Sequence, residues 1–276
     1  MKVAMIVIVF IMGAVLLIPM ALMVSGSFVG AQERTGARSR LVPRIPTLEN
    51  YVNLFMYNPV LRWIRNTLFV ALMRIPMNAL LDVSVAFAIA KYTFKGRGLL
   101  FGGLALAIIL PGYATIIPSY VIIRGVGLFN TLWGLIIPSL VDAGAIWYLV
   151  KYMKSIPDSM IDMGRIDGLG PFRLLWHVIV PMTIPAMAAL ASIKTIGIWQ
   201  DYLWPMLLLR KPELYTITQG IRDAVYLAIL QAGAGALRRG RIDLAGAVVA
   251  TVPAVTMFIV AQRYFIGGLF SKTGGG

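Results

Sequence analysis

Polar and aromatic side chains occur at a few positions within otherwise apolar stretches of the chain. The candidate positions are the consecutive residues Trp199, Gln200, Asp201 and Tyr202, and separately Tyr113. Aromatic faces stack on sugar rings, and carboxylates and amides bind hydroxyl groups, so this combination suits a polyhydroxylated solute. The same residue types also serve as interfacial tryptophans and as hydrogen-bonding groups between helices. The sequence leaves both interpretations open.

Charged residues also lie inside apolar segments. Arg74, Asn78 and Asp82 follow one another at intervals of four residues, which places them on one face of a helix. Lys194 and Asp201 are seven residues apart on one helix face, so they could pair with each other. Intramembrane charges of this kind face a cavity, or hold helices together through ion pairs and hydrogen bonds.

The sequence lacks the residues that common catalytic and metal sites require. It has no cysteine and a single histidine, His177, which excludes thiol chemistry and a histidine-rich metal site. The apolar segments contain no paired carboxylate cluster, which argues against a membrane-embedded enzyme. No G-x-x-x-x-G-K-[ST] phosphate loop is present, so the chain is not itself an ATPase of that class.

Composition places the chain in the membrane. Of its 276 residues 59% are hydrophobic and 13% charged, with a mean hydropathy of +0.83. A soluble domain carries about a quarter charged residues, so we expect an all-α integral membrane protein forming a single domain over residues 1–276. In a membrane protein, a net charge of +14 indicates lysines and arginines that lie near lipid headgroups. No basic run is interleaved with aromatics as in nucleic-acid binders.

Hydropathy predicts six transmembrane helices. A short surface helix capped by Thr47 is expected before the second span, and a partly apolar helix, Thr218–Ala236, before the sixth. The expected spans are residues 3–28, 66–90, 99–117, 131–150, 186–209 and 244–264. Six spans put both termini on one side of the membrane, together with the polar stretch between spans four and five. The distribution of lysine and arginine between the two sides does not identify that side as cytoplasmic.

The polar stretch from Ser155 to Pro185 predicts two short helices. Ser155, followed by Pro157 and an acidic residue at 158, predicts the start of a helix of about a dozen residues, which Gly168 ends. A second helix over residues 172–180 is expected to stop at Pro181. Apolar residues on the first helix indicate either a protein partner or packing beneath the chain's own bundle.

This stretch resembles the cytoplasmic EAA loop of importer-type ABC transporter permeases. The residues that carry the resemblance are Ile156-Pro157, Ile166-Asp167-Gly168, Phe172, Ile179-Val180-Pro181 and Pro185. The name-giving triplet differs, because Asp162-Met163-Gly164 stands where the family has glutamate and two alanines. Asp162 retains an acidic residue at the first position, whereas Met163 and Gly164 replace the two alanines.

Further segments resemble the second permease subunit of maltose-type carbohydrate importers, in the same order along nearly the whole chain. These segments are Pro46–Phe55, Arg62–Ala71, Gly127–Thr131, Trp199–Pro205, Pro212–Thr216 and Gln262–Gly268. The tail SKTGGG lacks the usual final lysine-glycine pair of that family.

The resemblance implies a type I ABC importer permease bundle in a bacterial or archaeal cytoplasmic (inner) membrane, with both termini cytoplasmic. It implies three protein partners: a second homologous permease subunit, a dimer of cytoplasmic ATPase subunits and an extracytoplasmic solute-binding protein. It implies no cofactor in this chain, since ATP and Mg belong to the ATPase. Residues 155–182 would form the coupling loop. The expected ATPase-coupling residues are Asp162, Met163, Gly164, Ile166, Asp167 and Gly168.

Two functional questions stay open at this point. A secondary transporter driven by an ion gradient is the alternative to an ATP-driven sugar importer, although the sequence shows no inverted repeat. The basic outer loops are also compatible with an anionic solute as well as a neutral one.

Overall fold

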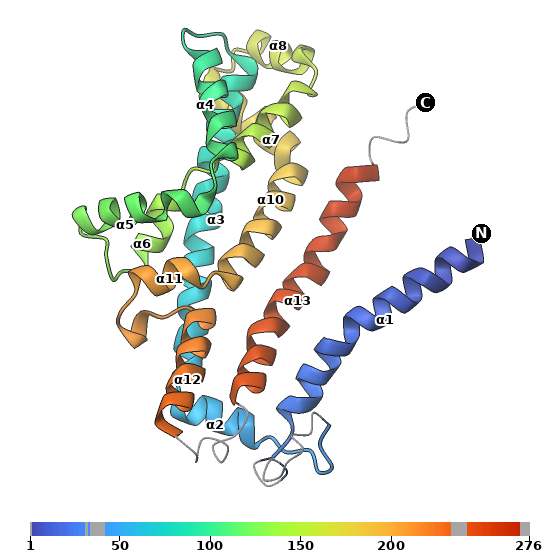
Figure 1. The fold of residues 1–276 in the computed structure, drawn as a ribbon. Coiled ribbons are helices and arrows are strands. Elements are labelled where there is room, and N and C mark those ends of the chain that lie inside the picture. The colour runs from blue at the N-terminus through green and yellow to red at the C-terminus, as the bar shows by residue number, and fades with distance from the viewer. Residues whose placement is uncertain (1, 31–32, 34–41, 233–241, 271–276) are drawn as a thin grey trace. The chain divides into compact units, whose positions relative to one another are not determined.

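The structure is a computed structural model, and it describes residues 2–30, 33, 42–232 and 242–270. These residues fold as helices joined by short turns, which confirms the predicted all-α class (Figure 1). The helices are α1 (Lys2–Ser27), α2 (Glu49–Tyr57), α3 (Val60–Lys91), α4 (Arg97–Ile109), α5 (Ile116–Gly125), α6 (Trp133–Ile136), α7 (Ala143–Lys154), α8 (Asp158–Ile166), α9 (Pro171–Leu174), α10 (Val180–Gln200), α11 (Leu203–Leu208), α12 (Ile217–Ala232) and α13 (Ile242–Phe270).

The chain forms two compact units, which are described separately. Unit 1 comprises residues 1–66 and 215–255, and unit 2 comprises residues 67–214 and 256–276. The prediction of a single permease domain remains a prediction. The tail at 271–276, much of the outer loop before Val42, and the end of the predicted helix Thr218–Ala236 lie outside the described residues.

In unit 1, glycines allow helices to approach closely. A Cβ atom on Gly220 of α12 would overlap the Trp63 ring, and one on Gly246 of α13 would lie 2.6 Å from the Ile221 side chain. The buried Asn50 amide of α2 donates to the carbonyl oxygens of Ser27 and Val29, at 2.6 and 3.0 Å. The start of α2 differs slightly from the prediction, because Leu48 rather than Thr47 is the N-cap residue.

Apolar helices of membrane-spanning length are present, as predicted. Within the described residues, three helical stretches are long and apolar enough to cross a membrane, and two bent pairs bring the number to five. The apolar helix α13 adds a sixth candidate, which is consistent with six spans.

The third and fourth predicted spans are bent rather than straight. α4 and α5 meet at 100° where Pro111 and Gly112 follow the extended residue Leu110. Proline supplies no N–H to a continuing helix and restricts the residue before it, so the helix ends there. The bend of 43° before α7 occurs at Asp142, whose Oδ1 accepts from the backbone N–H groups of residues 144 and 145 and so begins a new helix.

The fifth span begins earlier than predicted. The helix expected to stop at Pro181 continues, because α9 passes through a π-helical turn, Leu175–Ile179, directly into α10. Pro181 lies in the first turn of α10, where a missing N–H is tolerated. The wider turn and the Thr183 hydroxyl, which donates to the Ile179 carbonyl oxygen at 2.9 Å, accommodate the change of helical pitch.

One hydrophobic core in unit 2 joins α8 to the long helices. It contains buried side chains from α3, α7, α8, α9 and the π-helical turn, among them Val83, Phe87, Ile146, Leu149, Met153, Ile161, Leu174 and Ile179. The short helix α8 is therefore packed on its inner face.

An ionic cluster in unit 2 is centred on the buried Asp82. The Lys194 ammonium of α10 lies 2.7 Å from Asp82 Oδ2 and 3.3 Å from Asp142 Oδ2. Asp82 Oδ1 in turn accepts from the Asp142 backbone N–H at 3.1 Å. The nearby Asn78 amide donates to the carbonyl oxygens of residues 139 and 140. The expected pairing of Lys194 with Asp201 is therefore wrong, because Asp82 presents its carboxylate from α3 directly to the lysine.

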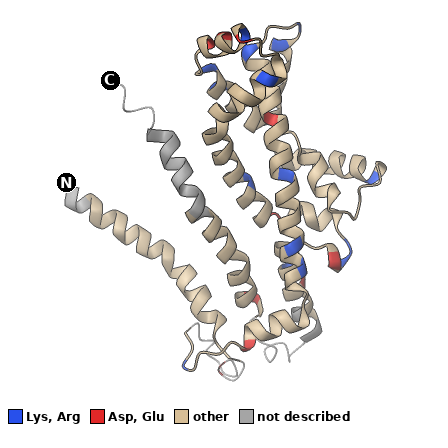
Figure 2. Cartoon of the chain, turned by 180° about the vertical axis from the view of Figure 1, so that it is seen from behind, with Lys and Arg blue, Asp and Glu red and all other residues tan. Residues whose placement is uncertain are grey.

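A second ionic contact holds the first turn of α8 against the end of α3. Lys91, the last residue of α3, donates from Nζ to Asp158 Oδ1 and to the Ile156 carbonyl oxygen, both at 2.7 Å. Figure 2 shows charged residues gathered at the end of the chain's long helices where α8 lies, and only a few charged residues along the middle of those helices. The lysine side chain is only 5% exposed, so its position is set by the packing around it.

Lys194→Met tests the buried cluster. The substitution leaves the Asp82 carboxylate buried without its cation, so we expect unfolding to become easier by about 3–5 kcal/mol. Thermal unfolding in detergent measures the effect, and the Asp82→Asn/Lys194→Met double variant should recover much of the loss. An unchanged midpoint in the single variant would contradict a stabilising role for the lysine.

The contact between Lys91 and Asp158 predicts a pH dependence. The Lys91 ammonium, by hydrogen bonding and by charge, holds the pKa of the exposed Asp158 carboxyl below its ordinary value. Because the paired form is the carboxylate, the contact is complete at neutral pH and is lost as the pH falls through that lowered pKa. Hydrogen exchange of the α8 amides, corrected for intrinsic rates, should rise in acid, and Lys91→Met should raise it at pH 7. The exposed lysine Lys95→Met serves as the matched control and should change nothing.

Candidate functional site

The helix expected to contact a partner, α8, begins later than predicted. Its N-cap residue is Pro157, and no side chain caps it. Ser155 instead ends α7, where its hydroxyl donates to the Tyr152 carbonyl oxygen at 2.7 Å. The prediction that Ser155 is the N-cap residue of this helix is therefore wrong, because Ser155 is the C-cap residue of α7. α8 is 9 residues long, shorter than the dozen expected.

The turn after α8 has the predicted glycine geometry. Gly168 has φ of 75°, a left-handed conformation that favours glycine. The N–H of Gly168 donates to the Arg165 carbonyl oxygen at 3.0 Å, and the Leu169 N–H donates to the Gly164 carbonyl oxygen at 2.9 Å. These bonds close the helix end and reverse the chain toward α9. Asp167, the C-cap residue, is exposed at this turn.

The two faces of α8 differ in character. Ile161 and Gly164 are buried, and a Cβ atom on Gly164 would lie 2.6 Å from Leu174 Cδ2. The outer face carries Met163 and Ile166, which are 58% and 84% exposed. Glycine at position 164 thus has a packing reason, since it lets α8 approach α9 closely. Gly164 can influence a partner only through that packing.

Asp162 also lies on the outer face of α8. Its carboxylate pairs with Arg165 of the next turn at 3.2 Å, and both side chains are about half exposed. An exposed pair of this kind contributes little to stability, so both groups can exchange partners readily.

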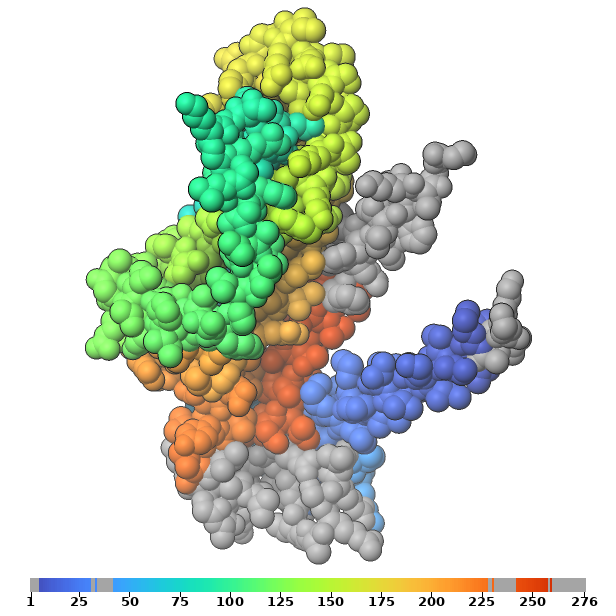
Figure 3. Space-filling view, turned by 45° about the horizontal axis from the view of Figure 1, so that its top comes forward, coloured from blue at the N-terminus to red at the C-terminus, as the bar shows by residue number. Residues whose placement is uncertain are grey.

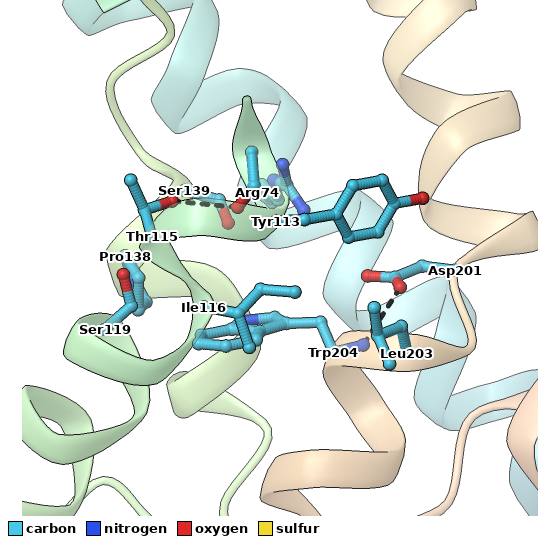
Figure 4. A pocket seen from close by; sticks show the side chains of 11 residues that line it. Arg74, Tyr113, Thr115, Ile116, Ser119, Pro138, Ser139, Asp201, Leu203 and Trp204 are labelled. Atoms are coloured by element: carbon cyan, nitrogen blue, oxygen red, sulfur yellow. Dashed lines mark hydrogen bonds between the residues drawn. The ribbon is translucent and has the colours of Figure 1, made fainter. Parts of the chain in front are cut away.

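A separate cavity of about 410 Å³ opens in unit 2 (Figure 4). Its walls come from α3, from the bend between α4 and α5, from the bend before α7, and from the junction of α10 with α11. The lining residues are Arg74, Gly112, Tyr113, Thr115, Ile116, Ser119, Pro138, Ser139, Asp201, Leu203 and Trp204. The helix breaks thus bring together residues distant in sequence. Figure 3 shows α4 and α5 as a continuous surface on one face of this unit.

Two charged side chains line the cavity. Arg74 makes no hydrogen bond or ion pair with any residue that the structure describes, and its Nε is buried without a partner. Asp201 ends α10 in an extended conformation, and its Oδ1 accepts from the Trp204 backbone N–H at 3.3 Å. The carboxylate thereby positions the start of α11. Asp201 attracts Arg74 through space without contacting it.

Only two of the five residues predicted to contact the solute line the cavity. Tyr113 and Asp201 line the cavity together, although they are far apart in sequence. Trp199 is only 3% exposed within the protein, and neither Gln200 nor Tyr202 belongs to the cavity lining. Helical rotation explains the difference, because the four neighbouring residues point in different directions as α10 ends.

Sequence reasoning missed several lining residues as members of the site. They are Thr115, Ser119, Ser139 and Trp204. Trp204 follows the candidate run Trp199–Tyr202 by two positions, and the first turn of α11 brings it to the cavity. The hydroxyl residues carried no sequence signal, because only the bends before α5 and α7 place them there. Arg74 was recognisable as an intramembrane charge, whereas its place in this cavity required the fold.

Comparison with protein families identifies the chain over most of its length. Residues 48–269 match the family described as "Binding-protein-dependent transport system inner membrane component". The matched region contains both α8 and the cavity.

Individual relatives agree with this match. The arabinooligosaccharides transport system permease protein AraQ of Halalkalibacterium halodurans is 28% identical over 254 residues, covering 91% of this chain and 88% of that protein. The sn-glycerol-3-phosphate transport system permease protein UgpE of Escherichia coli O1:K1 / APEC is 27% identical, with coverage of 93% and 91%. The diacetylchitobiose uptake system permease protein NgcG of Streptomyces coelicolor is 26% identical, with coverage of 94% and 84%.

Solved structures show the same fold. A chain in the crystal structure of a bacterial ABC transporter that imports the acidic polysaccharide alginate superposes with a TM-score of 0.82 at 23% identity, covering 96% of each chain. The family match shows that the chain is a transport subunit and not an enzyme. The resemblance inferred from the motifs is confirmed: the chain belongs to the family of inner-membrane components of binding-protein-dependent transport systems.

Proposed function

We propose that the chain is one of two related permease subunits of an ATP-driven importer, and that α8 is its docking helix for a cytoplasmic ATPase. The observation that carries this assignment is the two-faced character of α8. Its inner face is packed on the core, whereas Met163 and Ile166 project apolar side chains outward. Exposed apolar groups on a short helix in a polar turn suit a groove on a protein partner.

The contacts of α8 support transmission of motion into the bundle. Lys91 connects its first turn to the end of α3, and Gly164 brings it against Leu174, the last residue of α9. From α9 the helical path continues without a break into α10. A push on α8 therefore acts on α3 and α10, the two helices that carry Arg74 and reach Asp201 at the cavity.

The proposed partners follow from the same assignment. ATP and Mg would be bound by a dimer of ATPase subunits, and an extracytoplasmic binding protein would deliver solute. A second permease subunit would complete the pore. With α8 on the cytoplasmic side and six spans, both termini are also cytoplasmic.

We further propose that the solute is a carbohydrate. The relatives' names refer to arabinooligosaccharides and diacetylchitobiose, and also to sn-glycerol-3-phosphate. The titles of the similar structures refer to alginate. What these solutes share is a set of hydroxyl groups, which the polar lining of the cavity can bind.

ATP dependence is the direct test of the importer assignment. The chain, reconstituted with its partner subunits, should take up solute only when ATP is supplied on the ATPase side and the loaded binding protein on the other. Ionophores that collapse ion gradients should leave uptake unchanged. Uptake by the chain alone, driven by an ion gradient and without ATP, would establish a secondary transporter instead.

Met163→Glu/Ile166→Glu tests the docking face. Placing two charges in an apolar contact should weaken ATPase binding at least tenfold, as measured by co-purification and by ATP-driven uptake. Ile45→Glu is the matched control, because Ile45 is 77% exposed in the segment before α2 and distant in sequence from α8. Equal loss in both variants, or loss in neither, would contradict the assignment.

Gly164→Leu tests the packing of α8 separately. The larger side chain cannot fit against Leu174, so α8 should be displaced and ATP hydrolysis uncoupled from transport. Gly164→Ala requires only a small shift of a leucine methyl group and should retain most uptake. The two rates, hydrolysis and uptake, are measured on the same vesicles, and full coupling in the leucine variant would argue against this role.

A further inference from the structure

The cavity lining is balanced in charge. Of the residues that line it, Arg74 is the only cation and Asp201 the only anion. The remaining polar side chains are the hydroxyls of Tyr113, Thr115, Ser119 and Ser139. The volume of about 410 Å³ lies within the range of about 300–1,000 Å³ that is typical of small-molecule sites.

Arg74 needs acceptors that the protein does not supply. Its Nε is buried without a hydrogen-bond partner, and it forms no ion pair with Asp201 across the cavity. The Arg74 side chain also lines the cavity, and its terminal guanidinium nitrogens are not among the buried atoms. These nitrogens, rather than Nε, are available to donate to ligand oxygens.

The Asp201 carboxylate, by contrast, needs hydrogen-bond donors. One carboxylate oxygen accepts from the Trp204 N–H, and the group has capacity for further donors. A hydroxyl group placed between the two side chains can accept from Arg74 and donate to Asp201 at the same time. Sugar hydroxyls meet this double requirement, whereas a carboxylate or a phosphate dianion can meet only the Arg74 half.

Two aromatic side chains stand beside this pair. Figure 4 shows the Tyr113 ring above the Asp201 carboxylate and the Trp204 ring below and to the left of it. Tyr113 is 77% exposed, so its ring is free to contact a ligand. The apolar faces of sugar rings stack on such side chains, which adds affinity for a saccharide.

The surrounding charges disfavour an acidic solute. Lys194 is already paired with Asp82 and Asp142, so this neighbouring cluster offers no free cation to a solute. An anionic sugar would meet a single arginine together with Asp201. A neutral sugar would meet one cation and one anion in the lining, so it brings no unpaired charge into the cavity.

We infer that this cavity is a binding subsite for a neutral saccharide. Arg74 donates to its oxygens, Asp201 accepts from its hydroxyls, and Tyr113 and Trp204 contact its ring. The inference rests on the proposed importer function and specifies both the residues and the charge class of the solute.

Uptake by the reconstituted transporter tests this assignment. Vesicles would enclose ATP, with the binding protein outside, and would be offered neutral oligosaccharides or the same oligosaccharides carrying a terminal uronate or phosphate group. We expect uptake of the neutral compounds. Arg74→Gln and Asp201→Asn should each raise the KM for them about ten- to a hundredfold, as the loss of a hydrogen bond to a charged group implies. Arg124→Gln is the matched control, since Arg124 is exposed on α5 outside the lining, and its KM should stay unchanged.

The outcomes separate this inference from the importer assignment. ATP-driven uptake confined to uronate or phosphate compounds would overturn the neutral class while leaving the importer intact. Unchanged KM in both lining variants would overturn the site itself. Stimulation of ATP hydrolysis by the unloaded and loaded binding protein should remain in both variants, since the docking face on α8 is untouched. Absence of any ATP-dependent uptake in the unaltered protein would instead refute the importer.

Discussion

The contact of Lys194 with buried Asp82 and half-exposed Asp142 is the constraint on which unit 2 depends. Taking the Asp82 and Lys194 charges out of water is expensive, and the arrangement is stable only because each has an opposite partner at short distance. Lys194 reaches Asp82 at 2.7 Å and Asp142 at 3.3 Å, which fixes α10 against α3 and against the start of α7. Ser139 lies just before that start, and Arg74 lies two helical turns before Asp82. The cluster therefore also sets the geometry of the cavity.

The same cluster stands between the two functional regions in chain order. Along α3, Arg74 of the cavity comes first, then Asp82, then Lys91 at the contact with α8. Along α10 the order is reversed, since the path from α9 passes Lys194 before it reaches Asp201. A movement imposed on α8 would thus be carried to the cavity through two helices that a buried ionic contact holds together.

Small residues and helix breaks, not special chemistry, build the site. Pro111 ends α4 and turns the chain by 100°, which brings Tyr113 to the cavity. Gly164 lets α8 lie against Leu174 without displacing the leucine side chain. In each case the backbone requirement is local, while its consequence is the placement of a distant side chain.

The sequence by itself determined the class of protein, the approximate spans, the α8 region and the glycine turn at Gly168. These features depend on local composition, hydropathy and backbone conformation, which neighbouring residues encode. Only the tertiary structure decided that Lys194 pairs with Asp82 rather than Asp201, that Pro181 does not end its helix, and which polar residues share a cavity. Those outcomes depend on contacts between helices far apart in sequence. Helical spacing shows which residues share a face of one helix, but it does not show what that face meets.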